Sequence, residues 1–349
     1  MSQLQLPEGF TIQKFATDLG KPRMMAVTED GTLYVTRCAG DVRMLRDTDG
    51  DGQADVNKMV LELEQVHGLA IRNDHLYLIT VNEVYRSGIQ EGGMPEEPEL
   101  LMENLPDGGQ HPNRTIEFGP DNRLYVSVGS TCNACAETRE ENATMLVANL
   151  DGSEREIYAK GLRNTIGFDW HPQTNELFGL DHGIDWLGDT TQKEELNRLE
   201  EGNNYGWLYV YEDGQPNPAD EPPKGMSYEE YAKQITFPLM TLPAHSASLD
   251  MLFYDKKQFP EEYQQQAIAK LHGSWNRAEP SGYKLVKIQF DEEGQPEGYE
   301  DFITGFLVNE QKEYLARPCG LAVSQDGSLF FSDDAGGAIY KVSYEAKGR

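Results

Sequence analysis

Residues 110–130 read QHPNRTIEFGPDNRLYVSVGS, and this stretch decides the fold. Residues 119–122, Gly-Pro-Asp-Asn, predict a tight turn, because glycine has a free φ, proline a fixed φ, and asparagine tolerates a left-handed φ. One strand ends at Phe118 before the turn, and residues 124–128, Leu-Tyr-Val-Ser-Val, predict the next strand. His111 stands at the entry to the first strand, where a side chain can lie on the rim of a sheet.

The same strand-turn-strand frame recurs along the chain, and the polar residue near its entrance varies between copies. The copies begin at Pro22, His67, His111, Arg163, His245 and Arg317. Repeats of roughly 40–50 residues with several short strands indicate a β-propeller, and they are too long for the single coils of a solenoid. A four-stranded sheet has two apolar faces, which radial packing against neighbours buries. We therefore predict an all-β, six-bladed β-propeller with loop insertions in the later blades.

Helical signal is sparse: only residues 227–234 and 261–271 could form short helices, and both lie in the long gaps between repeats. Residues 214–223 are rich in Pro, Asn and Asp and predict an exposed loop. No linker divides the chain, so we expect residues 1–349 to form a single propeller domain.

The chain has 349 residues and a formal net charge of −29, from 30 Lys and Arg against 59 Asp and Glu. This balance argues against nucleic acid and against an anionic membrane surface, because phosphates need a basic face. No apolar run approaches the ~20 residues that a membrane helix needs, so we expect no membrane insertion. We interpret the charge as a solvated acidic surface, with a cationic redox partner as a further consequence.

The cysteine pattern leaves two readings open. Cys132 and Cys135 form one CxxC pair without nearby His ligands, which is weak for zinc, so we expect either a local disulfide or two free thiols. Ala136 follows the pair, so it is not a haem attachment motif. No signal peptide is visible, and the chain could be a mature form with an added start methionine. We expect a periplasmic or secreted protein.

Residues 47–55, DTDGDGQAD, resemble a calcium loop. Asp47, Asp49, Asp51 and Asp55 occupy relative positions 1, 3, 5 and 9, and the glycine at position 6 permits the sharp turn around an ion that takes six to eight oxygens. Position 12 is Lys58, where an EF-hand places a bidentate Glu, so the EF-hand is incomplete. The loop is either a structural calcium site or a solvated acidic turn at the outer end of the first blade.

His111 is the candidate general base, because an unperturbed histidine pKa of ~6.5 suits proton abstraction near neutrality. The blade starts of a propeller converge on one end of its channel. The polar residues that would meet there are His67, His111, Arg163, Asn164, His245 and Arg317. Since Arg binds carboxylates bidentately, this rim suits an anionic ligand. The alternatives are structural histidines, and arginines paired with nearby Asp or Glu.

Two further segments carry candidate ligand-binding residues. Residues 272–277 read HGSWNR. Trp275 can cover a planar ligand by stacking, and Asn276 and Arg277 offer hydrogen-bond donors; the alternative is a buried Trp beside a capped turn. Residues 181–185 read DHGID, in which Gly183 can present its own carbonyl and its neighbour's carbonyl to a metal.

Several motifs follow one another in a recognisable order. They are HPNR at 111–114, GLRN at 161–164, ELN at 195–197, NYGW at 204–207, HGSWNR at 272–277 and RPCGLAV at 317–323. Together with GSTCNAC at 129–135, they resemble the soluble quinoprotein glucose/sorbosone dehydrogenase family, especially its sorbosone and pyranose dehydrogenase-like branch. The resemblance extends from Leu6 to Val342.

The resemblance implies a six-bladed propeller that binds pyrroloquinoline quinone (PQQ) and calcium and oxidises an aldose or related polyol. His111 would take the hydroxyl proton while hydride passes from the sugar carbon to the quinone. Arg163, Asn164 and Arg317 would hold the carboxylates and quinone oxygens of the cofactor. An electron acceptor that the sequence does not identify would then take the electrons.

The resemblance also places calcium on the carbonyls of Gly183 and Ile184, where the ion would be completed by PQQ and would polarise the quinone as a Lewis acid.

The chain departs from the glucose dehydrogenase pattern at three places. Where that branch has a Lys on the quinone, the best match is Asn276, with Arg277 beside it. Gln110 replaces the acidic residue before the catalytic His. The pocket glutamine of blade two has no clear match, and His67 lies nearby. We assign His67, Gln110 and His245 to the substrate pocket.

Two other function classes remain as alternatives. The first is a calcium-dependent lactonase on a similar propeller, with a channel metal held by Glu, Asn and Asp side chains; blade starts rich in His and Arg weigh against it. The second is a non-catalytic propeller that binds a partner or glycan, with the Asp47 loop as a structural staple.

Overall fold

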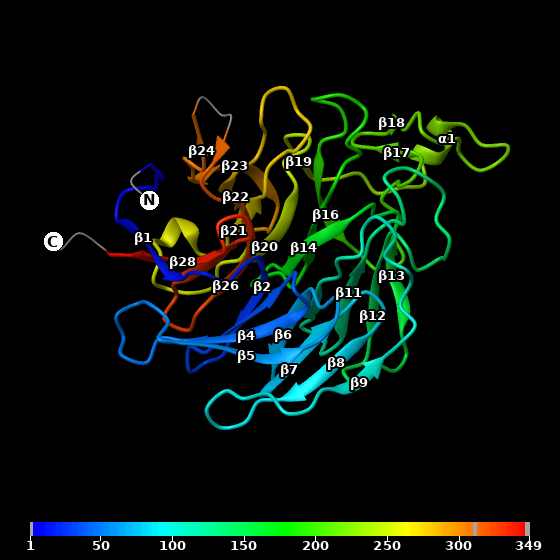
Figure 1. Cartoon of the computed structure of the whole chain (residues 1–349). Helices are drawn as coiled ribbons and strands as arrows, with labels where there is room; N and C mark the ends of the chain where they lie inside the picture. Colours follow the sequence, from blue (N-terminus) through cyan, green and yellow to red (C-terminus); the bar gives the residue numbers. More distant parts are fainter. Residues whose placement is uncertain (1–2, 310–312, 346–349) are drawn as a thin grey trace.

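The computed structural model of the chain describes residues 3–309 and 313–345. Six antiparallel sheets of four strands each form the blades of a ring (Figure 1). The first three blades consist of β2 (Pro22–Val27), β3 (Leu33–Arg37), β4 (Asp41–Arg46) and β5 (Val56–Glu62); β6 (Gly68–Arg72), β7 (His75–Ile79), β8 (Val84–Gly88) and β9 (Glu99–Met102); and β10 (Ile116–Phe118), β11 (Leu124–Val128), β12 (Thr144–Ala148) and β13 (Glu156–Lys160). The last three consist of β14 (Thr165–Trp170), β15 (Leu177–Asp181), β16 (Glu194–Leu199) and β19 (Met240–Leu242); β20 (Ser248–Phe253), β21 (Ala267–Leu271), β22 (Lys284–Phe290) and β23 (Pro296–Ile303); and β26 (Pro318–Val323), β27 (Leu329–Asp333), β28 (Ala338–Tyr344) and β1 (Phe10–Ala16). The predicted all-β, six-bladed propeller is confirmed.

The first strand of each repeat is the first strand of a blade, as the turn frames predict. In the stretch at residues 110–130, β10 ends at Phe118 and β11 begins at Leu124, and Asn122 in the turn between them has a φ of 62°. This left-handed φ is the conformation that an asparagine tolerates. The local turn chemistry therefore sets the strand boundaries.

The last blade is completed from the other end of the chain. Strand β1 pairs antiparallel with β28, from Phe10 opposite Tyr344 to Ala16 opposite Ile339. This pairing covers an edge of the last sheet, whose peptide groups would otherwise be unpaired, and it joins the two ends of the described chain in one blade. The repeat pattern did not predict this closure.

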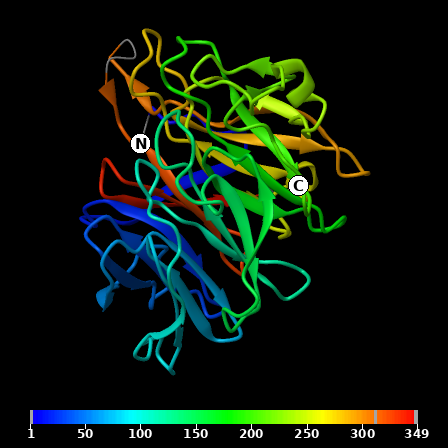
Figure 2. The ribbon, with the colours of Figure 1, turned by 90° about the vertical axis from the view of Figure 1, so that its right-hand side faces the viewer.

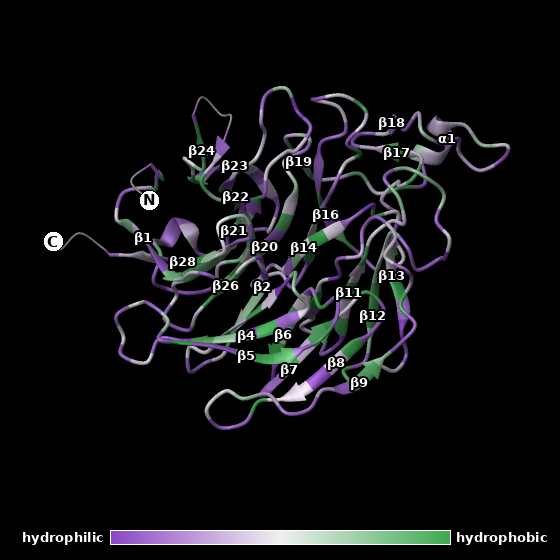
Figure 3. Cartoon of the chain, viewed as in Figure 1, coloured by the Kyte–Doolittle hydropathy of each residue, from purple (hydrophilic) through white to green (hydrophobic). Residues whose placement is uncertain are grey.

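Apolar side chains fill the spaces between neighbouring blades. Ile79 of the second blade packs with Ile116 and Leu124 of the third, and Phe178 of the fourth packs with Val286 of the fifth. Equivalent clusters join the other neighbouring pairs. Each sheet thus buries both faces, as radial packing requires, while the connecting loops are mostly hydrophilic (Figure 3).

Insertions lie in the later blades, as predicted. The segment between β16 and β19 carries β17 (Val210–Tyr211), β18 (Gln215–Pro216) and α1 (Tyr228–Ala232), and it lies in the upper part of the view in Figure 2. Helix α1 begins with a capping box, in which the Ser227 side chain accepts from the Glu230 N–H and the Glu230 carboxylate accepts from the Ser227 N–H. A further pair, β24 (Leu307–Val308) and β25 (Glu313–Tyr314), follows β23.

The expectation of a helix across residues 261–271 is wrong. Only Glu261–Tyr263 forms a 3₁₀ turn, η1, and Ala267–Leu271 is strand β21 in the middle of its sheet. Its apolar run is buried on both faces by neighbouring blades, and a short buried run of this kind does not distinguish strand from helix by periodicity. Among the described residues, every helix is too short and too polar to span a bilayer.

Candidate functional site

Loops at the ends of the inner strands enclose a cavity of about 260 Å³. Seven residues that the sequence analysis singled out line it: Gln110, His111, Arg163, Asn164, Gly183, His245 and Trp275. The cavity also has lining residues that the sequence analysis did not assign, among them His182, Asp185 and Glu194. The predicted convergence of blade starts therefore holds for the third, fourth and fifth blades.

His111 is held in one tautomer. Its Nδ1 lies 2.8 Å from the carbonyl oxygen of Ser130, and because a carbonyl only accepts, Nδ1 carries the hydrogen. The Nε2 atom has no hydrogen-bond partner among the described residues and keeps its lone pair. Burial, reinforced by the charge of Arg163, lowers the pKa of His111 to about 3. The ring is therefore neutral near pH 7, as a general base must be.

Gly129 allows His111 to approach its neighbours. It directly follows β11, and a Cβ built on it would lie 2.6 Å from Oδ1 of Asn164 and 2.7 Å from Cβ of His111. Both distances are shorter than real contacts of a Cβ. The glycine in the sequence Val-Gly-Ser is thus required by the close packing of His111 and Asn164.

Arg163 is buried, 3% exposed, and fixed from several sides. Its Nε and Nη2 donate to the backbone oxygen and Oδ1 of Asn133, at 3.0 and 2.5 Å, and Nη1 donates to the carbonyl of His182 at 3.2 Å. Its guanidinium lies over the ring of Trp207, 5.6 Å from the centroid. These contacts hold a buried cation in the cavity lining, and among the residues that the structure describes Arg163 forms no salt bridge.

The turn that carries Arg163 and Asn164 is held by one buried carboxylate. The N–H groups of Arg163 and Asn164 donate to Oδ2 and Oδ1 of Asp181, at 2.9 and 2.8 Å. Asn164 Nδ2 lies 3.4 Å from Nδ1 of His182, whose Nε2 donates to the carbonyl of Ser248 at 2.9 Å. Burial lowers the pKa of His182 to about 4, so this second cavity histidine is also neutral.

Glu194 gives the cavity an acidic wall. It is 2% exposed, and its Oε1 accepts from the Ala247 N–H at 3.2 Å, while its Oε2 has no partner among the described residues. Burial raises the pKa of this carboxyl to about 8. Asp185 lines the same cavity. The sequence signal for Glu194 is weak, since it stands in a strand beside the resemblance motif ELN rather than at a blade start.

Gly183, just after the end of β15, packs closely against the backbone of Gln192. A Cβ on this residue would lie 2.3 Å from the backbone oxygen of Gln192, so only glycine fits. Ile184, predicted beside it as a metal ligand through its carbonyl, does not line the cavity; its side chain is buried with Ala143, Trp207 and Leu208.

His245 and Asn276 form a support for the cavity wall. His245 Nε2 lies 2.9 Å from the Gly188 carbonyl and Nδ1 lies 2.7 Å from Oδ1 of Asn276, whose Nδ2 donates to the Asp185 carbonyl at 2.7 Å. Asn276 therefore links two loops instead of lining the cavity. Trp275 beside it does line the cavity and is 72% exposed.

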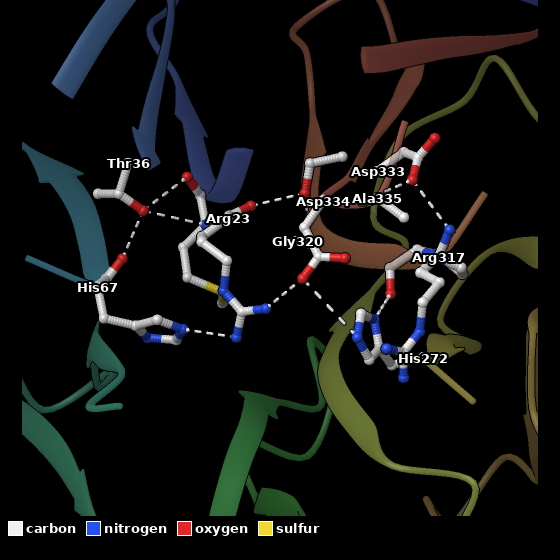
Figure 4. A network of polar contacts seen from close by, with 12 residues as sticks. Arg23, Thr36, His67, His272, Arg317, Gly320, Asp333, Asp334 and Ala335 are labelled. Carbon is white, nitrogen blue, oxygen red and sulfur yellow. Dashed lines mark hydrogen bonds and ion pairs between the residues drawn. The ribbon is translucent and has the colours of Figure 1, made fainter. Parts of the chain in front are cut away.

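Other predicted site residues belong to a neighbouring polar network (Figure 4). His67 Nδ1 donates to the Arg114 carbonyl at 2.8 Å, so its Nε2 accepts from Arg23 Nη2 at 3.2 Å. Arg23 also pairs with Asp334 at 2.7 Å. His67 is 4% exposed, and burial lowers its pKa to about 3. Its ring nitrogens are thus both engaged, outside the cavity that holds His111.

Arg277 and Arg317 also lie outside the cavity lining. Arg277 Nη1 donates to the Ala244 carbonyl at 3.0 Å, and Arg317 Nη2 donates to the Gly273 carbonyl at 2.9 Å. The Nε atom of each arginine is buried without a partner among the residues that the structure describes. Each guanidinium therefore keeps unused donor capacity next to the site.

The Asp47 loop joins β4 to β5, away from the cavity. Carboxylate oxygens of Asp47, Asp49 and Asp55 lie within 4.8 Å of one another, which is the spacing of a metal site. Asp51 is not part of this group; its Oδ1 accepts from the Gln53 N–H. The structure thus brings three of the four predicted carboxylates together.

Of the two readings of the cysteine pattern, the structure has the local disulfide. Cys132 and Cys135 are bonded, while Cys38 is free and exposed and Cys319 is free and buried. The disulfide closes the loop that carries Ser130 and Asn133, the partners of His111 and Arg163.

Known proteins match this chain over nearly its whole length. A family model described as TrAA12-like matches residues 4–218 and 219–345. An uncharacterized protein of Borreliella burgdorferi is 30% identical over 363 residues, covering 99% of this chain and 92% of that protein. A pyrroloquinoline quinone-dependent sugar dehydrogenase of Hypocrea jecorina is 23% identical over 398 residues, covering 97% of this chain and 89% of that protein.

Solved structures share the fold. The calcium structure of a Trichoderma reesei carbohydrate-active enzyme of family AA12 superimposes with a TM-score of 0.87 at 22% identity, covering 98% of this chain and 97% of that chain. The holo form of the pyranose dehydrogenase PQQ domain from Coprinopsis cinerea gives a TM-score of 0.82 at 19% identity, covering 97% of each chain.

Proposed function

The chain belongs to the TrAA12-like family and is a sugar oxidoreductase; on this premise we propose that it is a PQQ- and calcium-dependent dehydrogenase of an aldose or related polyol. The observation that carries the proposal is the fixed tautomer of His111, whose unpartnered Nε2 belongs to a residue that lines the same cavity as Arg163. A base and a buried cation in one cavity suit hydroxyl oxidation beside an anionic acceptor.

The residues present fit a quinone that carries carboxylates. Arg163 supplies a buried positive charge, and Asn164 supplies an amide next to it. Trp275, exposed at the cavity, offers an indole face to a planar ring system. The unused Nε–H donors of Arg277 and Arg317 lie close to the site and would serve acceptor oxygens after small side-chain shifts. We assign these five residues to cofactor binding.

The residues present also fit calcium, which prefers carboxylate and carbonyl oxygens. The unpartnered Oε2 of Glu194 and the carboxylate of Asp185 face a cavity that Gly183 also lines. A buried carboxylate without a partner is costly unless a cation or a proton compensates it. We propose that Glu194 and Asp185 support the ion, together with the carbonyls of Gly183 and Ile184 that the resemblance implies.

In the proposed reaction, His111 Nε2 accepts the proton of the sugar hydroxyl. The hydrogen bond from Nδ1 to Ser130 stabilises the charge that the imidazole gains. Arg163 and Asn164 orient the acceptor, and Gln110 contacts the sugar. His245, whose two ring nitrogens contact Gly188 and Asn276, shapes the wall of the sugar pocket. When bound, the calcium-polarised quinone supplies the hydride acceptor. His67 remains a proposed pocket residue without a hydrogen bond to the sugar, since both of its ring nitrogens are engaged.

We assign a second, structural calcium to the Asp47 loop. Asp47 also accepts from the N–H groups of Gly50 and Gly52, both at 2.8 Å, which shapes the loop around its carboxylates. Asp49 and Asp55 complete the cluster, and Asp51 would join through a water or a small rotation.

Reconstitution tests the proposal. The purified protein is treated with calcium and PQQ, and the absorbance spectrum is recorded before and after addition of a panel of aldoses. We expect cofactor binding and sugar-driven reduction of the quinone. A protein that binds no PQQ contradicts the proposal, whereas binding without reduction contradicts the choice of sugars in the panel.

One observation favours a second candidate function, a calcium-dependent lactonase. Glu194 and Asp185 bring two carboxylates to the channel end, which is the donor type that a hydrolytic metal site needs. Lactone hydrolysis by the calcium-loaded protein without PQQ would support it. The absence of that activity, together with quinone reduction by sugar, would exclude it.

The remaining assignments concern the whole chain. We infer that residues 1–349 form one domain, because β1 and β28 close the ring from its two ends. We also infer a periplasmic or secreted location, which the Cys132–Cys135 disulfide supports, since disulfides persist in oxidising compartments. The electrons pass to an acceptor outside the chain.

A further inference from the structure

A single loop contacts both the proposed base and the proposed cofactor arginine. It follows β11 and begins at Gly129, and the Cys132–Cys135 disulfide closes its tip. The loop is bound to Arg163 through the backbone as well, since the Ser130 N–H donates to the Arg163 carbonyl at 2.7 Å. The proposed reaction uses the Ser130 carbonyl behind His111 but gives no role to the Ser130 hydroxyl or to Asn133.

Ser130 determines how the ring of His111 is held. Its backbone oxygen and its Oγ lie 2.8 and 2.9 Å from His111 Nδ1. The Oγ donates its own hydrogen to the Cys132 carbonyl at 2.8 Å, so toward Nδ1 it acts as an acceptor. The hydrogen on Nδ1 is therefore shared by two acceptors of one residue, and the first disulfide cysteine orients the second of them.

Asn133 determines how Arg163 is held. It is 1% exposed and lies inside the four-residue ring that the disulfide closes. Its backbone oxygen accepts from Arg163 Nε and its Oδ1 accepts from Nη2. One residue thus takes two parallel N–H bonds of the guanidinium, and the disulfide limits how far its backbone oxygen can move.

The rest of the loop is anchored by hydrogen bonds alone. The Thr131 N–H donates to Glu137 Oε2 at 2.8 Å, and the other oxygen of Glu137 accepts from Trp207 Nε1 at 3.0 Å. The Thr131 carbonyl accepts from the Gln110 N–H at 2.8 Å, which ties the loop to the residue before His111. The tip between Cys132 and Cys135 is held instead by the disulfide together with the contacts of Cys132 to Ser130 and of Asn133 to Arg163.

We propose that Ser130 and Asn133 are positioning residues for His111 and Arg163, and that the Cys132–Cys135 disulfide holds both in place at once. The proposal rests on the proposed function for its catalytic meaning. A free carbonyl or amide can rotate, whereas a reacting group must be held close to its productive geometry. An acceptor held in a fixed position next to one ring nitrogen of a histidine also determines which tautomer that histidine adopts.

Two single variants separate the roles. Ser130→Ala is expected to lower kcat about tenfold with unchanged affinity for PQQ, and Ser130→Thr, which keeps the oxygen, should restore it. Asn133→Ala is expected to weaken PQQ binding ten- to a hundredfold, because hydrogen bonds to a charged group are lost. Thermal unfolding of each variant is recorded to confirm folding.

Matched controls come from buried residues of the same blade that touch neither target. Ser127→Ala removes an acceptor of the Thr115 N–H, and Asn142→Ala removes a donor to the Asp107 carbonyl. Both should lower the melting temperature without changing kcat or PQQ affinity. Equal changes of kcat and PQQ affinity in the target and control variants would show that Ser130 and Asn133 contribute only to stability, and would overturn the proposal.

The disulfide is tested in a Cys132→Ala, Cys135→Ala double variant, with Cys38→Ala as the control for an exposed free thiol. We expect the double variant to combine both losses. Nitrogen-15 NMR of histidine-labelled, cofactor-free protein reports the tautomer of His111 directly: Nδ1–H in the natural chain and a mixture in the double variant. An unchanged His111 spectrum overturns the positioning role, whereas a failure of the natural chain to bind PQQ overturns only the proposed function.

Discussion

His111 Nδ1, in the loop before β10, lies 2.8 Å from the carbonyl oxygen of Ser130, in the loop after β11 of the same blade. Because this oxygen can only accept, the contact assigns the ring hydrogen to Nδ1 and the lone pair to Nε2. A side-chain mutation does not remove this backbone carbonyl, so the tautomer depends on how the loop at Ser130, which the Cys132–Cys135 disulfide closes, is held.

Removal of the ring tests the assignment of the base. We expect His111→Ala to lower kcat by about 10²–10⁴, which is the usual contribution of an acid–base group, with PQQ still bound. His75→Ala is the control, because the His75 side chain hydrogen-bonds the Asn73 carbonyl in another blade, and His75 does not line the cavity. Steady-state kinetics and the spectrum of the bound quinone are the measurements. Turnover equal to that of the control would remove His111 from the mechanism.

Removal of the cavity arginine tests cofactor binding. We expect Arg163→Ala to weaken PQQ affinity about ten- to a hundredfold, since two charge-assisted hydrogen bonds are worth roughly this much. Arg317→Ala should have a smaller effect, because Arg317 donates to the Gly273 carbonyl and does not line the cavity. Titration with PQQ measures both, with the surface variant Arg123→Ala as reference. A larger loss of PQQ affinity in Arg317→Ala than in Arg163→Ala would contradict the assignment of Arg163 as the main cofactor arginine.

The close packing at Gly129 predicts a costly alanine. In Gly129→Ala the new Cβ would meet Asn164 Oδ1 at 2.6 Å and His111 Cβ at 2.7 Å, so His111 must move. We expect a loss of about 1–3 kcal/mol in the free energy of unfolding and a larger relative loss of kcat. Gly298→Ala, whose Cβ would meet only Gln289 Oε1 at 3.9 Å, is the control. An active Gly129→Ala protein would contradict this view of the site.

Two calcium sites with different roles should be separable. Asp47→Asn should reduce the stabilisation by calcium, about 2.7 kcal/mol for a site at a hundred times its Kd, and leave kcat unchanged. Glu194→Gln should instead reduce calcium-dependent activity. Melting temperatures and kinetics are compared with calcium and after chelation. Full activity of the chelated enzyme would refute the cavity ion, and loss of activity in Asp47→Asn would refute the structural role of the loop.

A buried carboxylate in the central channel predicts a pH dependence of stability. Burial raises the pKa of Asp250 to about 7, although Lys270 acts in the opposite direction. The unfolded chain releases this proton near pH 3.8 and the folded chain keeps it until about pH 7. The stability from this proton is therefore complete below pH 3.8 and is lost as the pH rises to 7, by on the order of 4 kcal/mol.

Asp250→Asn isolates this contribution. The variant cannot titrate at this position. From pH 4 to pH 7 the free energy of unfolding of the natural chain should therefore fall relative to that of the variant. Denaturant titrations at several pH values measure it. A pH-independent difference would show that Asp250 is ionised in the folded protein throughout that range.

Much of the fold followed from local sequence. The Gly-Pro-Asp-Asn turn before Leu124 and its counterparts restrict φ and ψ over a few residues, and the apolar strands around them need a partner on each face. These two properties are sufficient for six blades. They also place His111, Arg163 and Asn164 at blade starts, which is why the core of the site could be predicted.

The tertiary structure alone decided the features that depend on distant segments. Strand β1 pairs with β28, which is almost the full length of the chain away. Glu194 lines the cavity although it stands in the third strand of its blade, and the alternation of a strand does not predict which residues line a cavity. Arg317 stands at a blade start, yet its guanidinium turns to the Gly273 carbonyl. Sequence determines turns, strand limits and the alternation of faces, because these are set within a few bonds. The direction of a rim side chain is set by which neighbouring loop offers it a hydrogen bond, and that is known only when the ring is closed.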